Sequence, residues 1–218
     1  MHDKVDDIAD VLDRLAKLDF NALDEFSRRD VLDLARTAFS RVMNYAMARF
    51  GLKLDCWCTN SAQWFAKLET SGEELLAEMK KLRQFAHCLT ELLEASGDFS
   101  LNVAMAELRK RHEVNPVFEH TLKGNAENNY CRSFVYELAK ECYEPALAEY
   151  EKLLIQRVQD DDRRVWNGLT GYLKEKMAVI ENAFYEKELS KMAPDITAAG
   201  KRIPQTLSLM AELTRQFK

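Results

Sequence analysis

The sequence contains few of the residues that interrupt regular secondary structure, with seven glycines and four prolines in 218 residues. Leu, Ala, Glu, Lys and Met are abundant instead, which is typical of helices joined by short connections. Apolar and polar residues nowhere alternate over the length of a strand, so no segment is a candidate for β-structure. We therefore expect an all-α fold, a bundle of six to eight helices that are mostly antiparallel, with short loops and no sheet.

Long hydrophobic runs are also lacking. No window approaches the ~18 uninterrupted apolar residues that a membrane span requires. The first ten residues, MHDKVDDIAD, show no basic region followed by an apolar segment, as a secretion signal would. The five cysteines are an odd number in a chain without such a signal, which favours free thiols. These features predict a soluble, cytoplasmic protein with no membrane partner.

Basic charge is scarce and scattered. The net charge is −5, and the first 27 residues alone hold eight acids against three bases. The densest basic cluster is Arg109-Lys110-Arg111-His112, and three bases do not make a surface that follows a nucleic-acid backbone. We expect no nucleic-acid binding.

Motifs for metal, redox and phosphate chemistry are absent. The sequence has no Glu-x-x-His, His-Glu-x-x-His or Cys-x-x-Cys and no glycine-rich phosphate loop. Cys56 and Cys58 form the closest thiol pair, but tetrahedral zinc needs two further ligands, and the only nearby pair of suitable type, His87 and Cys88, diverges on a helix. We expect no metal and no cofactor, and the lack of these motifs favours a non-enzymatic protein without deciding the question.

Apolar residues recur at spacings of three and four, which predicts helices with one buried face. One such stripe consists of Val5, Ile8, Leu12, Leu15 and Leu18. Capping residues predict a second helix from Ser27 to Gly51, a long helix from the capping box at Ser71 to about Ser96, and a terminal helix opening at Pro204. Pro145 is expected to kink or restart a further helix. We expect residues 1–218 to form a single all-helical domain; a division into subdomains near residues 97–130, where breaks concentrate, is the second choice.

One short motif carries possible chemistry. His120-Thr121-Leu122-Lys123-Gly124 resembles the signature of histidine-containing phosphotransfer domains, helical bundles that relay a phosphoryl group between response regulators. The resemblance implies that His120 accepts the phosphoryl group, that Lys123 offsets its charge, and that Gly124 gives the regulator room. On a helix the three residues would share one face.

The same letters also fit the end of a helix. In that interpretation a short helix from Pro116 ends at Leu122 and Lys123, and Gly124 takes the left-handed conformation that stops it. Lys123 would then suit the negative end of the helix dipole.

These observations favour a non-enzymatic, cytoplasmic helical protein that acts through protein–protein interaction, as an adaptor, a regulator or a structural component. Its partner would be another protein or a second copy of this chain, and the acidic first helix could dock on a basic partner. The first alternative is histidine phosphotransfer through His120. The second is a bundle with an apolar small-molecule pocket lined by Trp64 and Trp166.

Overall fold

The structure, a computed structural model, describes residues 2–59, 70–127, 134–164 and 171–216. Within these ranges every regular element is helical and none is a strand, which confirms the all-α class. α6, the π-turn η2 and α7 follow one another without a break and count as one helix. The described residues then form eight helices. The elements are α1 (His2–Ala16), α2 (Glu25–Thr59), α3 (Gly72–Glu94), η1 (Gly97–Phe99), α4 (Leu101–Arg111), α5 (Pro116–Glu127), α6 (Tyr136–Leu138), η2 (Ala139–Tyr143), α7 (Glu144–Gln159), α8 (Gly171–Glu186), η3 (Leu189–Lys191) and α9 (Ile196–Arg215).

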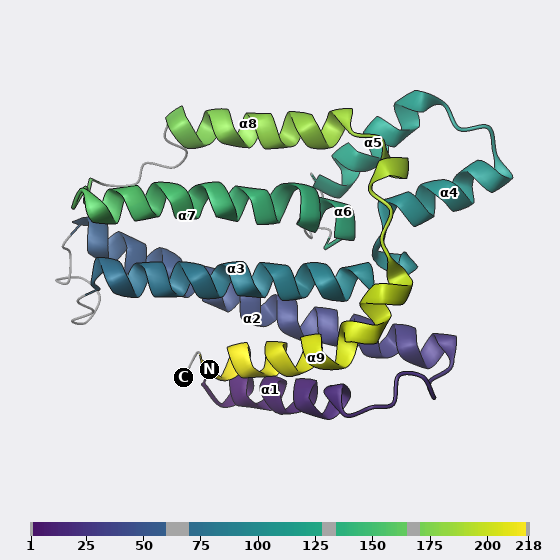
Figure 1. Ribbon diagram of the computed structural model, residues 1–218, viewed down its shortest axis with the longest axis horizontal. Coiled ribbons are helices and arrows are strands. Elements are labelled where there is room, and N and C mark those ends of the chain that lie inside the picture. Colours follow the sequence, from purple (N-terminus) through teal and green to yellow (C-terminus); the bar gives the residue numbers. More distant parts are fainter. Residues whose placement is uncertain (1, 60–69, 128–133, 165–170, 217–218) are drawn as a thin grey trace.

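The long helices run alternately in opposite directions. Figure 1 shows α2, α3, α7 and α8 lying along one another, each antiparallel to the helix before it, and α1 paired with α9 on the other side of α2. The start of α1 and the end of α9 therefore lie side by side. None of the described helices combines the length and the hydropathy needed to cross a bilayer.

The apolar stripes form two adjoining core clusters. The larger cluster buries one face each of α1, α2, α3 and α9, and in it the rings of Phe39 and Phe85 stack with centroids 4.8 Å apart. The smaller cluster includes residues of α4, α5, α8 and η3, such as Met105 and Phe184. Tyr143 packs against both clusters. The helix α3 buries a continuous apolar stripe: Leu75, Met79, Leu82, Phe85, Ala86, Leu89, Leu92 and Leu93.

The second helix is longer than predicted at both ends. It begins at Glu25, because the Asp24 carboxylate accepts the backbone N–H of Ser27 at 2.8 Å, and Ser27 is not its cap. It continues past Gly51 to Thr59, because Leu54 and Trp57 extend the buried stripe by two further turns. A single glycine inside a helix costs only about 1 kcal/mol, which this burial exceeds.

The terminal helix also begins earlier than predicted. Asp195 caps it by accepting the N–H of Ala198 at 3.0 Å, and Pro204 lies inside α9. Because proline has no N–H, the carbonyl of the residue four before it, Gly200, loses its intrahelical hydrogen bond. Burial of Ile203 and Leu207 on either side of Pro204 offsets the lost hydrogen bond.

Other helix starts are set by side-chain caps or follow a π-turn. Ser71 and Glu74 form the predicted capping box of α3, and Ser100 caps α4. Pro145 lies in the first turn of α7, directly after the π-turn in which the N–H of Glu144 bonds the carbonyl of Ala139 five residues earlier.

Candidate functional site

The His120 motif lies within α5, not at its end. The helix continues through Gly124 to Glu127, and Gly124 does not take a left-handed conformation, so the helix-end interpretation is wrong. The last turn is held in place because Ala126 is buried and Glu127 accepts the hydroxyl of Tyr185. Packing against α8 therefore keeps residues 124–127 helical, although their sequence is also typical of the end of a helix.

Lys123 is buried and turned away from solvent. Its Nζ donates to the carbonyls of Lys187 at 2.5 Å and Tyr185 at 3.2 Å, and lies 3.5 Å from the Glu119 carboxylate. A cation at this place binds the orphan carbonyls at the C-terminal end of α8. The structure thus does not bring Lys123 to the surface beside His120, where the resemblance would need its charge.

His120 is exposed on α5 and rests against an aromatic ring. Its centroid lies 4.7 Å from that of Tyr185, with the planes tilted by 43°. Burial, followed by the hydrogen bond to Glu127, raises the pKa of Tyr185 to about 12, so this phenol stays protonated at neutral pH. The imidazole of His120 is therefore accessible, but the ammonium group of Lys123 does not lie beside it.

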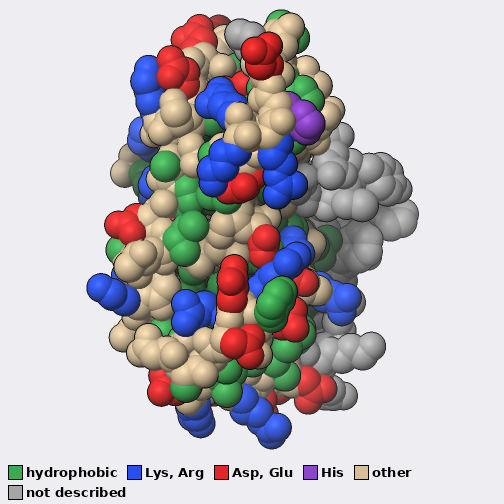
Figure 2. Space-filling model, turned by 90° about the vertical axis from the view of Figure 1, so that its right-hand side faces the viewer, with side chains coloured by type: hydrophobic (Ala, Val, Ile, Leu, Met, Phe, Trp, Pro, Cys, Tyr) green, Lys and Arg blue, Asp and Glu red, His purple; other side chains and the backbone are tan. Residues whose placement is uncertain are grey.

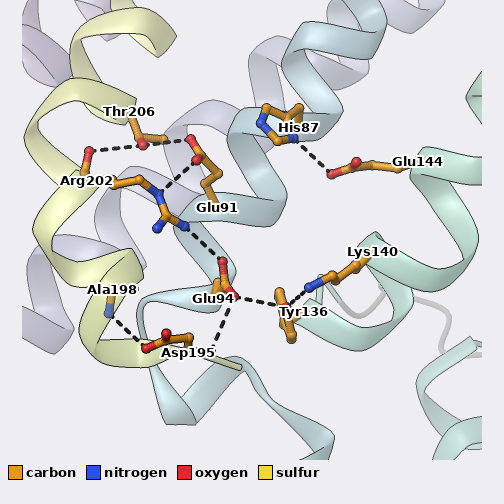
Figure 3. Close-up of polar contacts among 10 residues, drawn as sticks. All are labelled: His87, Glu91, Glu94, Tyr136, Lys140, Glu144, Asp195, Ala198, Arg202 and Thr206. Atoms are coloured by element: carbon orange, nitrogen blue, oxygen red, sulfur yellow. Dashed lines mark hydrogen bonds and ion pairs between the residues drawn. The ribbon is translucent and has the colours of Figure 1, made fainter. Parts of the chain in front are cut away.

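A row of polar contacts joins α3 to its neighbours (Figure 3). Arg202 of α9 binds the carboxylates of Glu91 at 3.1 Å and Glu94 at 3.2 Å. Glu94 also accepts the hydroxyl of Tyr136 at 3.1 Å, and Tyr136 in turn accepts a hydrogen bond from Lys140. Burial raises the pKa of the Tyr136 phenol, whose side chain is only 1% exposed. These groups join α3, α6, η2 and α9, and the carboxylates of Glu91 and Glu94 are already bound by Arg202.

Two of the described thiols are unsuited to nucleophilic chemistry. None of the four described cysteines forms a disulfide, and burial raises the pKa of both Cys88 and Cys142 to about 12. Only a thiolate is a good nucleophile, so these two groups are inert at neutral pH. Across the described ranges, no three His, Cys, Asp or Glu side chains converge as a metal site would require.

The most exposed large hydrophobic side chain of the described residues lies where α2 begins. Phe26 is 75% exposed, more than any other large hydrophobic side chain described. It stands at the rim of a groove of about 860 Å³, which we call the end groove, between α2, the α3–α4 connection, α4 and the start of α9. Its lining consists of Glu25, Phe26, Arg28, Arg29, Leu32, Ala95, Ser96, Gly97, Asp98, Val103, Ala104, Glu107 and Ile196. Figure 2 shows this end of the molecule, where hydrophobic side chains lie among charges of both signs.

A second hollow adjoins the end groove on the other side of Phe26. The ion pair between Arg29 and Asp98, at 2.9 Å, separates the two hollows and lines both. In the second hollow the Arg36 guanidinium lies 5.0 Å from the centroid of the Phe99 ring. Phe26 therefore projects between two concave surfaces.

Sequence reasoning missed this groove. Phe26 precedes the predicted helix start at Ser27, so it was not placed on any helix. When α2 is drawn as a helical wheel from Glu25, Phe26 falls on the face opposite the buried residues Leu32, Ala35 and Phe39. With that helix start, the sequence predicts an exposed aromatic side chain. The partners across the groove come from residues 95–107 and Ile196, and no local pattern reveals that proximity.

The remaining sequence candidates, Trp64 and Trp166 of the apolar-pocket alternative, lie outside the described residues, and that alternative stays a prediction. Comparison with known proteins finds no match to this chain, either among protein-family models, among curated proteins or among solved structures.

Proposed function

We propose that this chain is a cytoplasmic protein that acts by binding another protein, as an adaptor, a regulator or a structural component, and that the partner docks at the end groove. The observation that carries the proposal is Phe26, an aromatic ring exposed to 75% at the rim of a concave surface. Burying such a ring stabilises a complex by about 1.5–3 kcal/mol, and aromatic anchors surrounded by polar rims are typical of binding hot spots.

The chemistry of the other groups supports binding over catalysis. Cys88 and Cys142 are held protonated, and the carboxylates of Glu91 and Glu94 are bound by Arg202. The acidic first helix is a weaker docking candidate than the groove. Arg215 of α9 already binds Asp10 at 3.1 Å and also binds Asp13.

Cross-linking in cells followed by affinity capture tests this proposal with a matched pair of variants. Phe26→Ser removes the ring at the groove, and Val179→Ser removes an apolar side chain that is 65% exposed on the distant helix α8. We expect wild type and Val179→Ser to retain one partner that Phe26→Ser loses. A partner retained by Phe26→Ser, with cross-links outside the groove, would contradict the proposal.

A second candidate function is phosphoryl transfer through His120. The observation that favours it is the exposure of this imidazole on a helix that continues through Gly124 on the same face. Incubation with a phosphorylated response regulator should then transfer label to wild type and not to His120→Gln. Labelling of the variant, or an unlabelled wild type, would rule out this function.

A further inference from the structure

We infer that a second copy of this chain docks at the end groove, so that two copies form a reciprocal dimer in which each Phe26 fills the groove of the other. This inference rests on the proposed function, because it uses the same surface and names its partner. A two-fold interface requires a surface that is complementary to itself, with projection and hollow, and with charges of both signs, on one patch.

The shape of the patch meets the first requirement. Phe26 projects at the rim of the groove, and Val103, Ala104 and Ile196 supply apolar surface within it. Ile196 is itself 39% exposed although it lies in this concave surface. Because the projecting ring and the hollow adjoin, a two-fold axis beside the first turn of α2 would bring both rings into apolar surroundings at once.

The charges of the patch meet the second requirement. Arg28 donates to the carbonyl of Phe20 at 2.8 Å, and no acid among the described residues neutralises it. Glu25, three residues before it on the exposed first turn, has no ion-pair partner in the described ranges. The neighbouring bases differ, since Arg29 binds Asp98 and Arg36 binds Asp33 within the chain. One positive and one negative charge thus remain for a second copy, with Glu25 of each facing Arg28 of the other.

The inferred contact is small, and small interfaces are typical of weak, transient association. Each copy contributes one projecting ring and one ion pair with an open, hydrated rim. Exposed ion pairs also weaken as salt screens them. We therefore expect a dimer that dissociates on dilution and more readily at high salt.

Sedimentation equilibrium of the full chain tests the inference. The mass of wild type should rise from 25.2 kDa toward twice that value as concentration increases. Phe26→Ser should remain monomeric over the same range, and Val179→Ser should behave as wild type. Circular dichroism of each variant establishes that the helices are intact.

Charge exchange distinguishes this reciprocal contact from other modes of association. Glu25→Arg alone and Arg28→Glu alone should each raise the dissociation constant about tenfold, because like charges then face each other. The double variant should return close to the wild-type value. A monomeric wild type, a dimer that survives Phe26→Ser, or a double variant no tighter than the single ones would overturn the inference. If wild type is monomeric in sedimentation but still has a cross-linked partner that Phe26→Ser loses, the dimer is ruled out and the proposed function is not.

Discussion

Two buried charged side chains, Glu137 and Lys123, bind the backbone at the ends of helices in the smaller core cluster. The Glu137 carboxylate accepts hydrogen bonds from the hydroxyl of Ser100 at 2.5 Å and from the N–H groups of Leu101 and Asn102, both at 2.9 Å. It thus satisfies the N-terminus of α4, whose partial positive charge it complements. Lys123 does the converse at the C-terminus of α8.

Replacing Glu137 with glutamine should lower the free energy of unfolding by about 1–3 kcal/mol. The amide keeps the size of the side chain but turns one acceptor into a donor, which leaves a buried N–H of α4 unpaired. Urea denaturation measures the change, and Glu175→Gln on the exposed face of α8 serves as control. A loss no larger than that of the control would show that α4 does not depend on this carboxylate.

Substitution should affect stability strongly at Lys123 and little at His120. Lys123→Met should destabilise the protein by about 1–3 kcal/mol, because the carbonyls of Tyr185 and Lys187 at the C-terminal end of α8 lose their donor. His120→Gln should change stability by less than about 0.5 kcal/mol, because the imidazole is exposed. Thermal unfolding of both variants compares them directly. A tolerated Lys123→Met would mean that this lysine is available for another role.

At the scale of the element, helix boundaries follow buried contacts more than the local letters at the boundary. Gly51 and Gly124 both resemble stop signals, yet α2 and α5 continue through them. In each case apolar residues beyond the glycine find a buried surface, through Leu54 and Trp57 in α2 and through Ala126 in α5. That surface comes from other helices, so a local pattern cannot reveal it.

Alanine at two helical glycines should act in opposite directions. Gly51→Ala should stabilise the protein by about 0.5–1 kcal/mol, because an added Cβ there meets nothing within 4 Å and alanine favours the helix. Gly72→Ala should destabilise it by about 1–3 kcal/mol, because its Cβ would lie 2.5 Å from Cγ1 of Val158 on α7. Urea denaturation of both variants checks the signs. Equal shifts in one direction would contradict the close approach of α3 and α7.

At the scale of the whole molecule, the pairing of α1 with α9 brings the first and last described helices together. Arg215, at the end of α9, binds Asp10 and Asp13 on α1.

The larger core cluster also buries titratable groups. One of them is the Cys88 thiol, and burial raises its pKa from 9.0 to about 12. Tyr150, which packs against this cluster, has its pKa raised to about 12 by the same cause.

Stability should therefore fall at alkaline pH. The folded chain keeps these protons up to a pH of about 12, while the unfolded chain releases the thiol proton near pH 9, so the unfolded state binds fewer protons above that pH. The free energy of unfolding should hold through pH 8 and decline between about 9 and 12. Urea titrations at pH 8 and 11 measure the decline, and Cys88→Val should reduce it. An unchanged free energy at pH 11 would show that the thiol titrates in the folded chain.

The sequence by itself determined the helical class, the buried stripes and several caps, because helix periodicity and capping act within a few residues of one another. It also placed His120 among the exposed groups that could carry chemistry. Only the tertiary structure decided that Lys123 serves the end of α8, that Gly51 and Gly124 lie inside helices, and that Phe26 stands at a groove. Each of these outcomes depends on contacts between residues distant in the chain, such as Lys123 with Lys187 and Phe26 with the surface that Val103 and Ile196 line. The free energy gained by packing helices together exceeds the helix propensity of any single residue. The apolar periodicity of one helix predicts which face is buried, but it does not predict which other helix covers that face.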